Sequence, residues 1–350
     1  MNGRPAADIR QELDRFRERY RSFNRDIESN AVARGWCTPN RVVLEKGPVR
    51  LREFIVGPEE GAVPVLIVYS HVNRADVIDI DPDHSMVRRL AEAGNRVFLM
   101  DWARTSDADR EKDLSVYVLD AIGDALDFVS GATGFERINL VGICQGGTFA
   151  LSHACLRPGR VRRLGLVVTP VDFHAGDSLI RLWSRHIRFT RLAAHPVNVP
   201  GELITLMFRS ARPFDDLRRH VRRIDGHEED SDFEFSLRMD RWVHDCPDQP
   251  GRAFAQFMGD LYGENRLVRG TFEVRGEAVD LKRLETPVLN VFAESDHLVP
   301  PGSSTALGAH VDPGLYGELP FGGGHIGLIV SARAQREVHP ELGRWLSAGR

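Results

Sequence analysis

The chain has 350 residues, of which 42% are hydrophobic and 27% charged, so it is long enough to bury a large core. A net charge of −4 argues against a nucleic-acid partner, and the four scattered cysteines include no C-x-x-C pair that would indicate a zinc site or a disulfide framework. The apolar stretches are much shorter than the roughly 18 residues that span a bilayer, and residues 1–10 lack an apolar signal region. We therefore expect a cytoplasmic protein with no membrane span.

The N-terminal residues 1–40 are predicted to form a helical segment. Within residues 6–28, apolar or aromatic side chains recur at helical spacings of three and four, at Ile9, Leu13, Phe16, Tyr20 and Phe23. An amphipathic helix of this kind packs either on its own domain or on another subunit, and the sequence leaves both open.

Strands and helices alternate after this segment. Residues 41–45 and 49–56 alternate in polarity around Lys46-Gly47-Pro48, which predicts a hairpin. Short buried strands are then expected at 64–70, 96–100, 137–141, 163–169 and 287–293, with helices at 84–93, 111–130 and 147–156. Continuous apolar strands that alternate with helices indicate a mostly parallel sheet covered by helices on both faces.

The alternation stops after the predicted strand at 163–169 and resumes at Pro287. The segment between these points is helical or irregular in pattern and rich in aromatic residues. An insertion of that size between two strands of one sheet usually forms a cap over the strand ends. We therefore divide the chain into a core of residues 41–170 and 287–350 and a cap of residues 171–286.

One cysteine stands on a glycine-rich corner between a predicted strand and a predicted helix, in the sequence Gly142-Ile143-Cys144-Gln145-Gly146. This is the pattern of the nucleophile elbow of the α/β-hydrolase fold. The nucleophile of an elbow has a strained backbone and its neighbours pass close by, so glycine is needed at 142 and 146. Cys144 is thus the candidate nucleophile, and the start of the following helix favours its thiolate. Core or surface thiols are expected at Cys37, Cys155 and Cys246.

A thiol nucleophile needs a base and an orienting carboxylate, which this fold places on loops after later strands, in the order nucleophile, acid, histidine. Asp296 follows the predicted strand at 287–293, and His325 lies on a glycine-rich loop before a final helix. We assign Asp296 as the acid and His325 as the base. Glu294 is the alternative acid, and His297 is a weaker alternative base because it shares the loop of the acid.

The oxyanion hole is expected to use two backbone N–H groups. One belongs to Gln145, which follows the nucleophile, and the other to the loop after the strand at 64–70, where we favour Val72. The fold class predicted from all of these patterns is α/β. More specifically, it is an α/β-hydrolase fold, with a mostly parallel sheet, helices on both faces and an inserted helical cap.

From about residue 40 to the C-terminus, the sequence resembles the polyhydroxyalkanoate synthases, and among them the catalytic subunit of the two-component class III type. The stretches that carry the resemblance are Val65 to Tyr69 with Val72-Asn73-Arg74, Gly142 to Gly147, Thr169 to Phe173, Trp242 with Pro247-Asp248-Gln249, Asp296 to Pro301 with Ser303-Ser304, and Gly323 to Gly327. The sequence departs from the usual family pattern at Ala103-Arg104-Thr105, at His71, where we expect an apolar residue, and at Gly322, where proline is common. These departures bear on substrate chain length and pocket shape.

The resemblance implies an enzyme that polymerises (R)-3-hydroxyacyl-coenzyme A into a polyester and releases coenzyme A. Cys144 would carry the acyl group as a thioester, with His325 as the base and Asp296 as the third member of the triad. The resemblance implies no cofactor, since coenzyme A enters with the substrate. It also implies a non-catalytic partner subunit, a homo-oligomer, and a place in the cytoplasm at the surface of polymer granules.

Two other functions compete with polymerisation. A cysteine-dependent hydrolase of the dienelactone hydrolase type shares the elbow and the order of the triad, but such enzymes are shorter and lack a large cap. A catalytically silent α/β-hydrolase that serves as a scaffold would have no reason to keep all three triad residues. Release of free acid without polymer would favour the hydrolase, and failure of Cys144 to react with an acyl analogue would favour the scaffold.

Overall fold

A computed structural model describes residues 35–57, 61–176, 178–194, 197–210 and 230–349, together with Arg15 and Glu18. The helix expected over residues 6–28, and with it most of the predicted N-terminal segment, lies outside the described residues. In the part of the chain that the structure describes, every helix is too short or too polar to cross a membrane.

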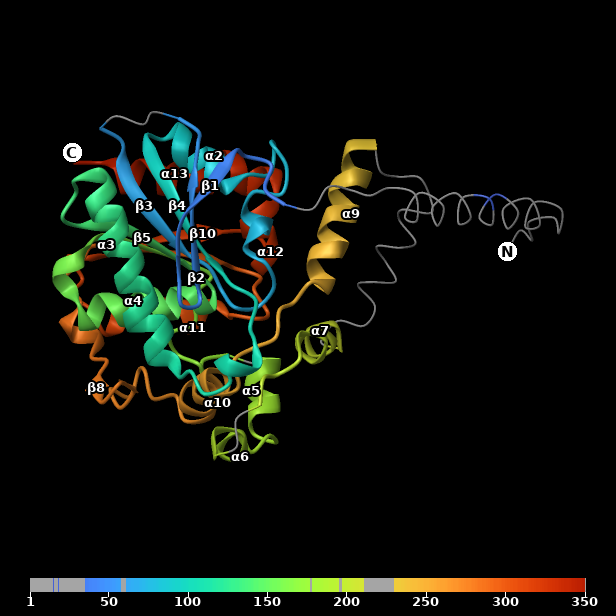
Figure 1. The fold of residues 1–350 in the computed structure, drawn as a ribbon, viewed down its shortest axis with the longest axis vertical. Coiled ribbons are helices and arrows are strands. Elements are labelled where there is room, and N and C mark those ends of the chain that lie inside the picture. Colours follow the sequence, from blue (N-terminus) through green and yellow to red (C-terminus); the bar gives the residue numbers. More distant parts are fainter. Residues whose placement is uncertain are drawn as a thin grey trace, which may run out of the picture.

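An eight-stranded sheet forms the centre of the molecule, in the order β1-β2-β4-β3-β5-β6-β9-β10 (Figure 1). Its strands are β1 (Asn40–Lys46), β2 (Val49–Phe54), β3 (Val63–Val68), β4 (Asn95–Trp102), β5 (Ile138–Ile143), β6 (Val161–Val167), β9 (Val288–Ala293) and β10 (Tyr316–Phe321). The pairs β1–β2 and β2–β4 are antiparallel, and all other neighbours are parallel. The prediction of a hairpin followed by a mostly parallel sheet is therefore confirmed.

One strand of this sheet, β10, was not predicted from the sequence. Among the described residues, it is an edge strand whose one neighbour is β9. Its residues Tyr-Gly-Glu-Leu-Pro-Phe are mostly half-buried or exposed, and Pro320 cannot donate to a ladder. The continuous apolar pattern that marks the buried strands is therefore missing here. The turn after β10 nevertheless carries His325 to the same edge of the sheet as the end of β9.

Helices cover both faces of the sheet, and each face has its own hydrophobic core. Side chains of α3 and α4 belong to one core, and side chains of α2, α12 and α13 belong to the other. The helical elements outside the insertion are η1 (Ala75–Ile78), α2 (Met86–Glu92), η2 (Asp107–Asp109), η3 (Val116–Ala121), α3 (Ile122–Thr133), α4 (Gln145–Leu156), η4 (Pro158–Arg160), α11 (Pro301–Thr305), η7 (Ala306–Ala309), α12 (His325–Val330) and α13 (Ala332–Ser347).

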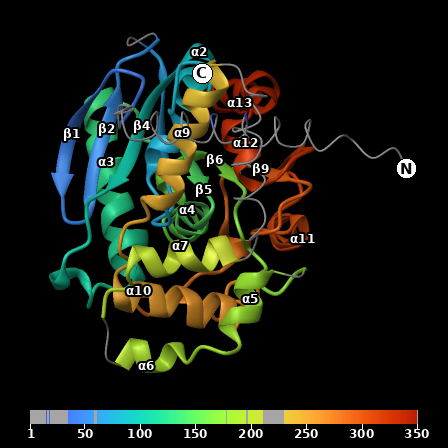
Figure 2. The ribbon, with the colours of Figure 1, turned by 90° about the vertical axis from the view of Figure 1, so that its right-hand side faces the viewer.

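The segment between β6 and β9, which we call the insertion, is mostly helical where it is described. Its elements are α5 (Leu179–Ser184), α6 (Phe189–Ala194), α7 (Gly201–Ser210), α9 (Asp230–His244), α10 (Gly251–Gln256), η5 (Phe257–Gly263), β7 (Glu273–Val274), β8 (Glu277–Ala278) and η6 (Leu281–Arg283). Figure 2 shows α5, α6, α7 and α10 grouped below α4, beyond the end of the sheet. This is the end at which the parallel strands finish, so the insertion lies over the loops that carry the candidate site.

Candidate active site

Cys144 forms the tip of a tight turn between β5 and α4. Its φ of +54° and ψ of −123° are unusual for a residue with a side chain, and its backbone N–H donates to Val167 O at 2.9 Å. A Cβ atom on Gly142 would lie 2.4 Å from the Cα of Gly147, and one on Gly146 would lie 2.2 Å from Val68 O. Both glycines are therefore required by close packing, and the turn has the geometry of a nucleophile elbow.

The structure brings Asp296 and His325 together beside this turn. Asp296 lies on the loop after β9, and its Oδ2 atom is 2.6 Å from Nδ1 of His325. Its other oxygen, Oδ1, accepts the backbone N–H groups of Leu298 and Val299 at 2.8 and 2.9 Å. The side chain of Asp296 is fully buried and that of His325 is 6% exposed. His325 is the first residue of α12 and not part of the preceding loop, so the rigid start of a helix holds the imidazole ring.

The electrostatic surroundings favour a protonated His325. Burial by itself lowers the pKa of His325, but the Asp296 carboxylate, the nearby Cys144 sulfur, and hydrogen bonds to both side chains raise it to about 10. The imidazole is thus linked to the carboxylate on one side and to the sulfur on the other. Residues 144, 296 and 325, which are far apart in the sequence, thus lie together, with Asp296 and His325 hydrogen-bonded and His325 lining the same cavity as Cys144.

The alternative residues lie elsewhere in the structure. Glu294 is exposed, and its carboxylate lies beside Gly322, near the Arg333 guanidinium. The carboxylate that contacts His325 is that of Asp296, on the same loop as His297. The remaining cysteines are free thiols, with Cys155 buried and Cys37 and Cys246 half-buried. Burial is the largest cause that raises the pKa of Cys155 to about 12 and of Cys246 to about 11, which makes both poor nucleophiles.

Two apolar cavities meet at Cys144. The larger, of about 180 Å³, is also lined by His325 and by Ser70. The smaller, of about 80 Å³, extends between helices of the insertion and is lined by Trp183, Met207, Phe254 and Met258, among others. Both cavities share Val72, Cys144, Ile180, Phe208 and Tyr262. The sulfur therefore stands where an acyl group could extend into either of two apolar spaces.

The loop after β3 lies against the elbow, as expected for an oxyanion loop. Val72 lines both cavities together with Cys144. Its backbone N–H donates to Oγ of Ser70 at 2.8 Å. The start of the loop is held by Nε1 of Trp102, which donates to Tyr69 O at 2.8 Å. Gln145, the other expected donor, is the first residue of α4. The roles of Gln145 and Val72 in an oxyanion hole stay predictions.

Several residues that shape this site were not predicted from the sequence. Ile180, Phe208 and Tyr262 line both cavities, but they belong to no motif and their pattern is that of ordinary helical core residues. Gln249 was noted only as part of a family stretch, although it is 2% exposed and lines the smaller cavity. A buried glutamine beside prolines is an unusual polar residue in an apolar setting, and this is the signal that could have identified it.

Among the residues that the structure describes, no group of three or more His, Cys, Asp or Glu side chains could hold a metal ion.

The parallel sheet, the strained elbow and the buried histidine and carboxylate together define an α/β hydrolase. Consistent with this, residues 64–332 match the family model described as the alpha/beta hydrolase fold. A monoacylglycerol lipase from Paleococcus ferrophilus shares the fold, with a TM-score of 0.56 at 16% identity over 85% of this chain and 98% of that one.

Curated relatives define the family more narrowly. The poly(3-hydroxyalkanoate) polymerase subunit PhaC of Allochromatium vinosum is 37% identical over 98% of both chains. The subunit of the same name from Thiocystis violacea is 39% identical over 92% of this chain and 91% of that one, and the one from Synechocystis sp. is 34% identical over 89% and 84%. The chain belongs to the family of poly(3-hydroxyalkanoate) polymerase PhaC subunits, which confirms the resemblance drawn from the motifs.

Proposed function

We propose that this chain polymerises (R)-3-hydroxyacyl-coenzyme A into a polyester and releases coenzyme A, with Cys144 as the covalent nucleophile. The single observation that carries the catalytic part is the buried hydrogen bond between Asp296 and His325, with His325 lining the same cavity as Cys144 at the tip of a nucleophile elbow. Membership of the polymerase family supplies the class of substrate.

Acylation begins when His325 takes the proton of the Cys144 thiol and the sulfur attacks the carbonyl carbon of the coenzyme A thioester. The bond between that carbon and the sulfur of coenzyme A breaks, and His325 gives its proton to the departing thiolate. The backbone N–H groups of Gln145 and Val72 would stabilise the negative oxygen formed during attack. Asp296 keeps the ring oriented and stabilises its protonated form, which the raised pKa of His325 supports.

Elongation uses the same residues, with His325 now taking a proton from the incoming group. His325 takes the proton from the hydroxyl group of another 3-hydroxyacyl unit, whose oxygen attacks the Cys144 thioester and displaces the sulfur. Sulfur suits this step because a thioester converts to an oxoester downhill, whereas transfer from a serine ester would be nearly thermoneutral. Water must be kept away from the acyl group during this exchange. The apolar lining of both cavities supports that exclusion.

The domain roles follow from this reaction. We propose that residues 171–286 act as the cap that shields Cys144, that residues 41–170 and 287–350 act as the catalytic core, and that residues 1–40 form an N-terminal helical segment. We also propose that the protein needs no cofactor beyond the coenzyme A of its substrate. Further proposals are a non-catalytic partner subunit, a homo-oligomer, and work in the cytoplasm at the surface of polymer granules.

The proposal is tested by replacing the nucleophile. Purified wild-type protein, with and without a co-expressed partner subunit, is given 3-hydroxybutyryl-coenzyme A while released coenzyme A and polymer are both measured. Wild type should yield polymer and covalently labelled Cys144, and Cys144→Ala should yield neither. Polymer from Cys144→Ala would overturn the role of the thiol, and free 3-hydroxybutyrate without polymer would favour the hydrolase.

A further inference from the structure

Two buried glutamines hold successive peptide groups of the loop after β3. The backbone N–H of His71 donates to Oε1 of Gln145 at 3.0 Å, and the backbone C=O of His71 accepts from Nε2 of Gln249 at 2.6 Å. Gln145 is 7% exposed and Gln249 is 2% exposed. Because a backbone N–H only donates and a backbone C=O only accepts, these contacts fix which way each glutamine amide is turned.

The contact of Gln249 acts on the peptide group that contains the proposed oxyanion donor. The C=O of His71 and the N–H of Val72 belong to the same peptide unit, which is planar, and its two dipolar bonds point in opposite directions. A hydrogen bond that fixes the direction of the carbonyl therefore also fixes the direction of the Val72 N–H. It also polarises the amide, which makes the N–H a stronger donor.

We propose that Gln249 is a positioning residue for catalysis, which holds the His71–Val72 peptide with its N–H directed toward Ser70 Oγ, at the wall of the cavity that Cys144 and His325 also line. There the carbonyl oxygen of the acyl group on Cys144 would take this donor from Ser70. This inference rests on the proposed function and on the proposed oxyanion role of Val72. It means that the cap contributes to the chemical step as well as to the walls of the cavities.

The surroundings of both partners restrict their movement. The backbone of Gln249 pairs in both directions with Val199, at 2.8 and 2.9 Å, so the segment before α10 is tied to the segment before α7. On the core side, the His71 ring packs against the rings of Trp102, Tyr117 and Phe149, with centroids 4.4 to 5.6 Å apart. Burial lowers the pKa of His71 to about 3, so the ring stays neutral in this apolar place.

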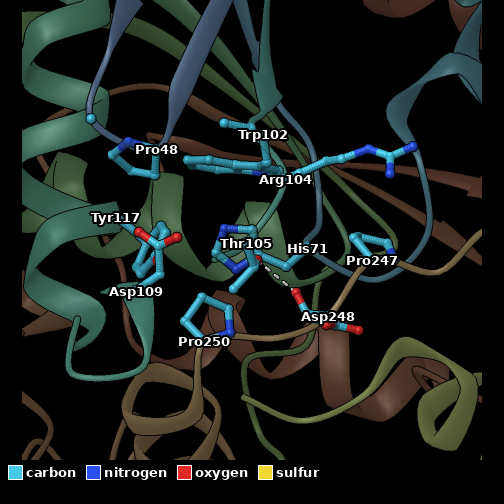
Figure 3. Close-up of a pocket in the computed structure, with 12 residues that line it drawn as sticks. Pro48, His71, Trp102, Arg104, Thr105, Asp109, Tyr117, Pro247, Asp248 and Pro250 are labelled. Atoms are coloured by element: carbon cyan, nitrogen blue, oxygen red, sulfur yellow. Dashed lines mark hydrogen bonds between the residues drawn. The ribbon is translucent and has the colours of Figure 1, made fainter. Parts of the chain in front are cut away.

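The same cap segment offers a matched control. Figure 3 shows His71 between the core residues Trp102 and Thr105 and the cap residues Pro247, Asp248 and Pro250. Oγ1 of Thr105 donates to Asp248 O at 2.7 Å, which joins core and cap one residue before Gln249. This contact anchors the same segment without touching the His71–Val72 peptide. Loss of the Thr105 bond therefore reports on cap anchoring alone.

The test compares Gln249→Met, Gln249→Glu and Thr105→Val with wild type in the full-length protein. Initial rates of coenzyme A release give kcat and KM for 3-hydroxybutyryl-coenzyme A, and thermal unfolding gives Tm. Gln249→Met keeps the volume but loses the donor, so kcat should fall by about 10- to 100-fold while KM stays within about twofold. Gln249→Met and Thr105→Val should lower Tm by comparable amounts, but Thr105→Val should leave kcat unchanged.

The pH dependence of kcat in Gln249→Glu is a measurement that would not change if Gln249 served only in packing. A carboxylate has no proton for the His71 carbonyl, whereas a protonated carboxyl group donates as the amide does. The kcat of Gln249→Glu relative to wild type should therefore rise as the pH is lowered from about 8 to about 6, since burial raises the pKa of a carboxyl group. The relative kcat of Gln249→Met should stay constant over that range.

Distinct results separate the two proposals. Unchanged kcat in Gln249→Met, or an equal loss of kcat in Thr105→Val, would overturn the positioning role while leaving the polymerase function intact. A flat pH response of Gln249→Glu would overturn it as well. Failure of the proposed function would instead show as wild-type protein that forms no acyl-enzyme at Cys144.

Discussion

The core half and the cap half of the site are built by different means. In the core, Cys144, Asp296 and His325 are held by backbone geometry and short hydrogen bonds, and close packing beside the nucleophile leaves no room for a Cβ at Gly142 or Gly146. In the cap, Trp183 and Met207 contribute apolar side chains that line a cavity. On the function proposed above, we expect the chemistry to depend on atom positions fixed by the core and the selection among acyl groups to depend on the shape that the cap provides. Changes in the two halves should have different consequences.

The largest expected effect comes from removing the carboxylate of the core. Asp296→Asn keeps the shape of the side chain but removes the charge that helps to raise the pKa of His325, so that pKa should fall. Elongation, which needs His325 as a base, should slow by about 10³-fold, while acyl-enzyme still forms. Rapid-quench measurement of labelled Cys144 beside polymer yield separates the two steps. Equal loss of both steps would contradict a distinct role for Asp296 in elongation.

Substitution of one glycine in each half tests how well the core and the cap accommodate an added Cβ atom. A Cβ on Gly146 of the elbow would lie 2.2 Å from Val68 O, whereas a Cβ on Gly259 of the cap would meet nothing nearer than the Cβ of Phe189 at 3.6 Å. Gly146→Ala should lower the free energy of unfolding by about 3 kcal/mol or more, and Gly259→Ala should change it by less than about 1 kcal/mol. Chemical denaturation of both variants provides the measurement, and similar losses would mean that the cap is packed as strictly as the core.

Cap selectivity is tested at Met207, which lines the smaller cavity. Met207→Ala enlarges that cavity, so the ratio of kcat/KM for 3-hydroxyhexanoyl-coenzyme A to that for 3-hydroxybutyryl-coenzyme A should rise by about 10-fold. Leu206, the preceding residue on α7, is 61% exposed, and Leu206→Ala is the matched control that should leave the ratio unchanged. An unchanged ratio in Met207→Ala would mean that the acyl side chain occupies another space.

The sequence predicted the core half of the site better than the cap half, for a physical reason. Parallel strands end at one edge of a sheet, so residues that follow β5 and β9 had to lie near one another once the strands were recognised. The edge strand β10 was missed because Pro320 and its half-buried neighbours give no apolar run. The contact of Gln249 with His71 joins residues 178 positions apart, and it depends on how the cap docks. Local patterns carry no information on such docking.

The smallest effect is expected at Ser70, which lies on the loop after β3. Its Oγ atom accepts the Val72 N–H at 2.8 Å and lines the same cavity as Cys144 and His325. If the Val72 N–H is the oxyanion donor, Ser70→Ala removes a competing acceptor, and kcat should stay within about threefold of wild type, because the donor itself is kept. Coenzyme A release at saturating substrate measures this. A loss of about 10²-fold would instead assign the donor to the Ser70 hydroxyl group, since removal of one oxyanion donor typically costs that much. The positioning role of Gln249 would then act through the segment that carries Ser70.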